Sequence, residues 1–142
     1  MERNELCWCG SGKKYKKCHL AFDEKLEQLK QQGKKIPTHK MIKTPEQIEG
    51  IKKAAVINSG LLDYIEANIK VGMTTEEIDV IAKEYTAKYG AVCADYQYMG
   101  YPKHICVSIN DVVCHGIPNE QTILQEGDIV NVDATTMLNG YY

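Results

Sequence analysis

Four side chains that bind soft metal ions lie within thirteen residues near the N-terminus. They are Cys7, Cys9, Cys18 and His19. Thiolates and a neutral imidazole are the ligands that tetrahedral Zn²⁺ prefers. A segment this short buries too little apolar surface to fold alone, so metal binding would supply its folding free energy. The sequence therefore predicts one structural zinc ion in a small module that covers residues 1–22.

Two disulfide bonds, or four unrelated residues, are the alternatives to a zinc site. Residues 1–6 lack the apolar segment of a secretory signal, so we expect a cytoplasmic protein whose thiols are reduced. A disulfide between Cys7 and Cys9 would also be strained. No apolar run is long enough to cross a bilayer, and we expect no membrane partner.

Charge divides the chain into two regions of opposite sign. Residues 1–43 contain eleven Lys and Arg against five Asp and Glu, whereas residues 44–142 contain six against fourteen. A basic module favours nucleic acid or another acidic surface, although a solvated basic face is an equally simple interpretation. The acidic remainder argues against nucleic-acid binding there.

A helix and a tether are expected at residues 23–43, between the two charged regions. Apolar residues at helical spacing begin at Leu20, and Gly33 is a plausible stop. Ile36-Pro37 does not continue a helix easily. We interpret residues 34–43 as an exposed tether.

Two capped helices are expected at the start of the region 44–142. Thr44-Pro-Glu-Gln47 and Thr74-Thr-Glu-Glu77 are capping boxes. Each is followed by apolar residues at helical spacing, which are most simply core faces. The expected core positions are Ile48, Ile51, Ala55, Leu62, Ile65 and Ile69 in the first helix and Ile78, Ile81, Ala82 and Tyr85 in the second.

Strand patterns follow Gly90. Residues 105–109 and 112–114 flank a turn at Asn110-Asp111, and residues 129–137 form a further β-rich run. Asn139-Gly140 is a hairpin signal, but only two residues follow it. A turn without its return strand leaves an unpaired edge, so we expect the sequence to be a piece of a longer protein.

The cysteine module resembles the SEC-C motif, a zinc-binding appendage. The resemblance covers residues 7–19 and includes Gly-Ser, Lys-Tyr-Lys and the final Cys-His. In that family such modules contact ribosomes or chaperones. The resemblance therefore implies a ribosome contact through the basic N-terminal end.

Residues 44–142 resemble the N-terminal portion of the type I methionine aminopeptidases. The resemblance rests on Gly72-Met-Thr-Thr, Gly100-Tyr-Pro-Lys, residues 108–118 and Gly127-Asp-Ile-Val-Asn-Val-Asp133. It implies a mixed α/β (α+β) fold, the N-terminal half of a pita-bread (creatinase/aminopeptidase-like) fold. It also makes residues 44–142 a catalytic domain truncated on its C-terminal side.

The resemblance also assigns roles to single residues. Asp133 matches one of five ligands of a two-metal site, and the other four would lie beyond Tyr142. Taken alone, Asp133 would more simply accept backbone hydrogen bonds, and a lone histidine in a loop is usually structural or merely exposed. His115 matches the catalytic histidine that hydrogen-bonds the scissile peptide. Tyr98, Tyr101 and Cys106 match the pocket for the methionine side chain, although their ordinary role would be core packing. Asp95 departs from the family pattern, because a cysteine is common at this position near the pocket.

The implied activity is removal of the N-terminal methionine from nascent chains. Two divalent ions (Co, Mn, Fe or Zn) would activate a water molecule for attack on the first peptide bond. The complete enzyme is expected to be monomeric, whereas residues 1–142 alone are expected to be inactive. The alternatives are a non-catalytic, zinc-dependent adaptor that binds ribosomes or nucleic acid, and a family member that has lost its second half.

Overall fold

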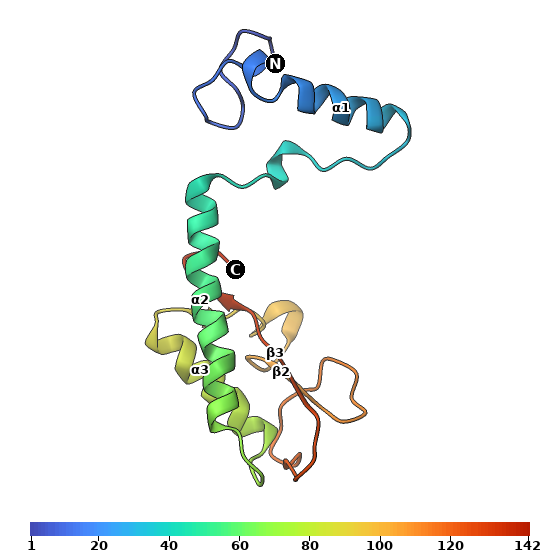
Figure 1. The fold of residues 1–142 in the computed structure, drawn as a ribbon. Helices are drawn as coiled ribbons and strands as arrows, with labels where there is room; N and C mark the ends of the chain where they lie inside the picture. Colours follow the sequence, from blue (N-terminus) through green and yellow to red (C-terminus); the bar gives the residue numbers. More distant parts are fainter. The chain divides into compact units, whose positions relative to one another are not determined.

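The computed structural model describes residues 1–39 and 41–142, which divide into two compact units, Met1–Ile48 and Glu49–Tyr142 (Figure 1). The first unit begins with an antiparallel bridge between Leu6 and Lys14 and the 3₁₀ turn η1 (Tyr15–Lys17). Helix α1 (Leu20–Gln31) and the short turn η2 (His39–Met41) follow. Gly33 closes α1 as expected, because its positive φ of 80° lets the chain reverse and its N–H reach Lys30 O.

Helix α2 (Pro45–Asn68) begins at the predicted capping box. The Thr44 N–H donates to Gln47 Oε1, and the Gln47 N–H donates to Thr44 Oγ1, at 2.8 and 3.2 Å. The buried face was only partly predicted, since Ile65 is buried but Ile48 and Leu62 are 43% and 40% exposed.

The core side of α2 is rotated from the expected stripe toward Ala54 and Leu61. This face carries the polar Asn58, whose Oδ1 accepts a hydrogen bond from Thr136 Oγ1 at 2.9 Å. A hydrophobic count misses such a position, because nothing local to the helix reveals the partner of Asn58.

Helix α3 (Thr75–Lys88) confirms its predicted cap and core face. Thr74 and Glu77 form both hydrogen bonds of the capping box. Ile78 and Ala82 are fully buried and share one hydrophobic cluster with Leu61 and Ile65 of α2. The cluster also contains Met73, Cys93, Ile105, Val107 and Leu124.

Two antiparallel strand pairs complete the second unit. β1 (Val92–Cys93) pairs with β4 (Thr136–Met137), and β2 (Cys106–Ile109) pairs with β3 (Val130–Asp133). The 3₁₀ turn η3 (Tyr98–Gly100) lies between β1 and β2 in the chain. Val107 of β2 belongs to the hydrophobic cluster, and Ile109 packs against it.

The predicted strand at 112–114 was wrong. The turn at Asn110 exists, with the Val112 N–H donating to Ile109 O, but the chain then continues as an irregular loop in which Val113 is 91% exposed. β2 pairs with β3 instead, and the Asn110 side chain fastens this pair by hydrogen bonds to Asp128 and the Ile129 N–H. Tertiary pairing therefore overrides the local strand propensity of the valines.

The expected β-run at 129–137 is divided between β3 and β4, which belong to different sheets. The turn predicted at Asn139-Gly140 is present, with positive φ at both residues and two hydrogen bonds between Leu138 and Tyr141. Within residues 1–39 and 41–142, no helix combines the length and apolarity that crossing a bilayer requires.

Candidate substrate cavity and candidate metal centre

One cavity of about 390 Å³ brings together all four predicted substrate-site residues. Its lining is Asp95, Tyr98, Tyr101, Cys106, His115 and Ile117. Three segments of the chain supply these side chains: the loop around η3, the first residue of β2, and the loop after β2. Ile117 was not selected from the sequence, although its place two residues after His115 could have suggested it.

The walls of the cavity are fixed by local hydrogen bonds. Tyr101 donates its hydroxyl proton to Ile105 O at 3.0 Å, which ties the η3 loop to the start of β2. Burial raises the pKa of the Tyr101 hydroxyl and that of the Cys106 thiol. Both groups are therefore protonated at neutral pH, so these two walls offer an aromatic ring and a neutral thiol to a ligand.

A buried carboxylate that the sequence interpretation did not identify holds this part of the chain in place. Asp79 in α3 is 2% exposed and accepts hydrogen bonds from the His104 N–H, the Ile105 N–H and His104 Nδ1. The His104 ring also stacks on Tyr96, with centroids 4.5 Å apart. The signal was an acidic residue next to Ile78 on an apolar helix face, where burial demands partners.

His115 stands in the loop that crosses β2. Its φ is +55°, in the left-handed region that few residues other than glycine occupy. Gly116 brings the loop against β2, because the Val107 N–H donates to Gly116 O at 2.9 Å and the Gly116 N–H donates to Ser108 Oγ at 3.1 Å. A side chain at Gly116 would meet the carbonyl group of Val107. This close approach fixes the backbone from which His115 enters the cavity lining.

Asp133 is the last residue of β3 and is paired in register with Cys106. The sequence interpretation treated it as a buried carboxylate, but the structure exposes it, because β3 is an edge strand whose Asn131 and Asp133 point away from the core. Among the described residues no hydrogen bond or ion pair engages its carboxylate. The oxygens are therefore accessible to a cation.

Asp95 lies close enough to Asp133 for the two charges to interact. Burial raises the pKa of Asp95, and the charge of Asp133 raises it further, while the Thr135 N–H donates to Asp95 Oδ2 at 3.2 Å and opposes the rise. A carboxyl group whose pKa is higher in the folded than in the unfolded state destabilises the fold as pH rises through the range between the two pKa values.

The substitution Asp95→Asn is therefore expected to raise stability at pH 7 and to have no such effect below pH 3.8, the ordinary pKa of this group. Urea unfolding at both pH values measures the difference. Asp128→Asn is the matched control with the opposite sign, because hydrogen bonds from Asn110 and the Gln125 N–H lower the pKa of Asp128. Equal responses of the two variants to pH would contradict the prediction.

The four predicted zinc ligands converge in the first unit. The ligand atoms of Cys7, Cys9, Cys18 and His19 lie within 4.8 Å of one another. Cys9 Sγ and Cys18 Sγ are 3.6 Å apart, and His19 Nδ1 lies 3.3 Å from Cys7 Sγ and 3.2 Å from Cys18 Sγ. Tetrahedral zinc with ordinary bond lengths separates two sulfurs by roughly 3.8 Å. The donor set and its spacing thus fit one tetrahedral soft ion.

The turn between the cysteines favours thiolate. Gly10 and Gly12 both have positive φ, as the predicted sharp turn requires. Hydrogen bonds from the Ser11 side chain and backbone lower the pKa of Cys9 to about 6. Burial raises the pKa of Cys7. At least one ligand is therefore ionised at neutral pH before any metal arrives, which assists metal capture.

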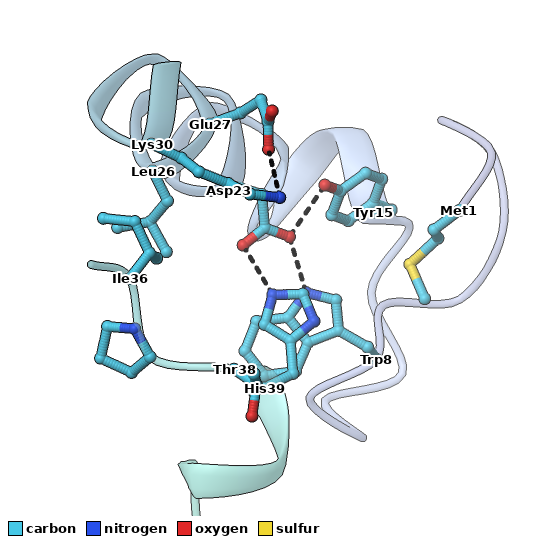
Figure 2. A pocket seen from close by; sticks show the side chains of 11 residues that line it. Met1, Trp8, Tyr15, Asp23, Leu26, Glu27, Lys30, Ile36, Thr38 and His39 are labelled. Carbon is cyan, nitrogen blue, oxygen red and sulfur yellow. Dashed lines mark hydrogen bonds and ion pairs between the residues drawn. The ribbon is translucent and has the colours of Figure 1, made fainter. Parts of the chain in front are cut away.

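Asp23 of α1 organises the remainder of the first unit (Figure 2). Its carboxylate accepts hydrogen bonds from Trp8 Nε1 and the Tyr15 hydroxyl, both at 2.8 Å, and contacts His39 Nε2 at 3.1 Å. Burial opposes ionisation, but these hydrogen bonds outweigh it and lower the pKa of Asp23. The tether expected at 34–43 is largely exposed, yet its residue His39 is fastened to the module, because Asp23 offers it a charged acceptor.

Two family models match separate parts of the chain. The model of metallopeptidase family M24 matches residues 49–142, and the SEC-C motif matches residues 3–21. The chain belongs to metallopeptidase family M24. The relatives and solved structures that follow confirm the resemblance to the methionine aminopeptidases and the pita-bread fold class.

Curated members of the M24 family show how much of an enzyme these residues represent. A methionine aminopeptidase of Chlamydia trachomatis is 42% identical over 149 aligned positions, which cover 100% of this chain and 50% of the relative. That of Escherichia coli K12 is 45% identical over 102 positions, covering 71% of this chain and 39% of the relative. The chain thus spans about half the length, or less, of the curated relatives it matches.

Solved methionine aminopeptidase structures share the fold of part of this chain. Methionine aminopeptidase from Rickettsia prowazekii superposes with a TM-score of 0.67 at 38% identity, covering 70% of this chain and 40% of that one. The enzyme from Thermotoga maritima gives a TM-score of 0.68 at 35% identity, with the same two coverages. The M24 portion of this chain therefore has the fold of the corresponding portion of these enzymes.

Proposed function

We propose that this chain contributes the substrate cavity and one catalytic-metal ligand to a methionine aminopeptidase. The observation that carries the proposal is the convergence of Tyr98, Tyr101, Cys106 and His115 on one cavity. Aromatic rings and a neutral thiol suit a thioether side chain, because their contacts are apolar and polarisable. The substrate would be a nascent polypeptide that begins with methionine, and the enzyme would act in the cytoplasm.

Two residues of this chain would act at the scissile peptide. Asp133, an exposed carboxylate at the end of β3, would hold a divalent ion together with ligands outside residues 1–142. Such ions supply activated water and polarise the carbonyl group. His115 would donate a hydrogen bond to the oxygen on which negative charge develops. We infer that residues 1–142 alone are inactive, since one carboxylate does not hold a two-metal site.

The experiment is a peptidase assay on the product of the reading frame that encodes these residues, at whatever length the gene specifies. With added Co²⁺, Mn²⁺, Fe²⁺ or Zn²⁺, methionine should be released from Met-Ala-Ser, and leucine should not be released from Leu-Ala-Ser. His115→Ala should lower kcat about 10²- to 10³-fold, as loss of an oxyanion donor does elsewhere.

Cys114→Ala is the matched control, because Cys114 is exposed and adjacent to His115 but absent from the cavity lining. The proposal would be overturned if a product with a complete set of metal ligands failed to release methionine with each of the four metals. The adaptor function would then be the better account of the chain.

We further propose that the first unit holds one structural Zn²⁺ and presents a basic surface to the ribosome. Lys13, Lys14, Lys16 and Lys17 are all exposed, so they are free to meet phosphate. Deletion of residues 1–43 should weaken co-sedimentation with ribosomes at every salt concentration tested. Unchanged co-sedimentation would remove the ribosome from the proposal and leave the peptidase function in place.

A further inference from the structure

The indole of Trp8 contacts two imidazoles. One belongs to the metal-cluster residue His19, with ring centroids 4.5 Å apart and planes at 40°. The other belongs to His39, which is stacked on the indole with centroids 4.0 Å apart and planes at 16°. Trp8 itself stands between the cluster residues Cys7 and Cys9. The same ring therefore touches the metal centre and the segment that returns from α1.

One carboxylate holds both members of the outer stack. Asp23 accepts a hydrogen bond from Trp8 Nε1 at 2.8 Å and contacts His39 Nε2 at 3.1 Å, and both rings point toward it in Figure 2. The three side chains and Ile36 share the lining of a cavity of about 530 Å³ inside the first unit. The segment 36–39 is thus attached to the module through Trp8 and Asp23.

We propose that His39 is a positioning residue for the metal centre, so that metal binding and docking of residues 36–39 strengthen each other. The proposal rests on the structural metal site of the proposed function. His39 touches no ligand atom. It acts by holding the Trp8 ring, and with it the Cys7–Cys9 turn and the adjoining face of His19, in the geometry that the metal requires.

Thermodynamic linkage makes the coupling reciprocal. If docking of His39 increases metal affinity by some factor, metal must increase the docking equilibrium by the same factor. Outer residues that orient metal ligands commonly change affinity 10- to 100-fold. His39 is half exposed and reaches the metal centre only through the Trp8 ring, so we expect a smaller factor of about three- to tenfold.

The first measurement is the metal affinity of the whole chain, by competition of Zn²⁺ against Co²⁺ with the cobalt–thiolate absorption as the signal. His39→Ala should weaken Zn²⁺ binding about three- to tenfold with an unchanged cobalt spectrum, because all four ligands remain. His39→Phe keeps the stack and should restore at least half of the loss on a logarithmic scale. Met41→Ala is the matched control, since Met41 is 65% exposed and belongs to the same turn.

The second measurement is the NMR signal of the His39 ring, which the stacked indole should shift upfield. Removing the metal with a chelator should return this signal toward its random-coil position, and restoring Zn²⁺ should reverse the change. A Zn²⁺ affinity of His39→Ala within twofold of the parent, or a His39 signal that ignores the metal, would overturn the inference. A parent chain that binds no Zn²⁺ at all would instead overturn the structural metal site itself.

Discussion

Removal of the proposed Zn²⁺, or of one thiolate ligand, is expected to unfold the cysteine module together with α1 and to leave Glu49–Tyr142 folded. The four ligands connect the segment around the Leu6–Lys14 bridge to the start of α1. Of the apolar side chains in the module and α1, only those of Cys7 and Tyr15 are buried. Zinc supplies about 10–16 kcal/mol of apparent folding free energy in modules of this size. No hydrophobic cluster of this size replaces it.

Cys9→Ser in the presence of Zn²⁺, and a chelator applied to the parent, should both produce this state. Amide hydrogen exchange reports each unit separately, and α1 should lose protection while α3 retains it. Cys114→Ser is the control, because Cys114 is an exposed thiol of the second unit. Full protection of α1 without metal would show that the module folds by packing alone.

Gly116→Ala is expected to destabilise the second unit by roughly 1–3 kcal/mol and to displace the loop that carries His115. An added Cβ would lie 2.8 Å from the Val107 carbonyl carbon and closer still to its oxygen. Both positions are backbone, so no side chain can rotate away. The loop must then leave β2, which breaks the hydrogen bonds of Gly116 to Val107 and Ser108.

Urea unfolding measures the loss of stability, and the rate of thiol labelling at Cys106, located by mass spectrometry, measures the opening of the cavity. Gly127→Ala is the control that separates lack of space from backbone conformation. The space around Gly127 is open, and only its φ of +88° opposes a side chain. It should leave labelling of Cys106 unchanged. The prediction would be contradicted if Gly116→Ala were as stable as the parent chain and its Cys106 were labelled no faster. The loop against β2 would then tolerate the extra atom.

Features that depend only on neighbouring residues could be predicted from the sequence. Both capping boxes appeared where Thr44 and Thr74 predicted them, since a cap is made within four residues. Gly33 and Asn139-Gly140 turned the chain because positive φ is a local property. The convergence of Cys7, Cys9, Cys18 and His19 was likewise predicted, because a thirteen-residue loop allows few other arrangements.

Tertiary structure decided what depends on distant partners. The core face of α2 includes Asn58 because Thr136 donates a hydrogen bond to it. Residues 112–114 form no strand, because β2 pairs with β3 and Gly116 lies against Val107. Asp79 and His39 gained their roles from His104 and Asp23, which lie 25 and 16 residues away in the chain. Such pairs leave no periodic trace in the sequence, because packing selects them only after the elements have formed.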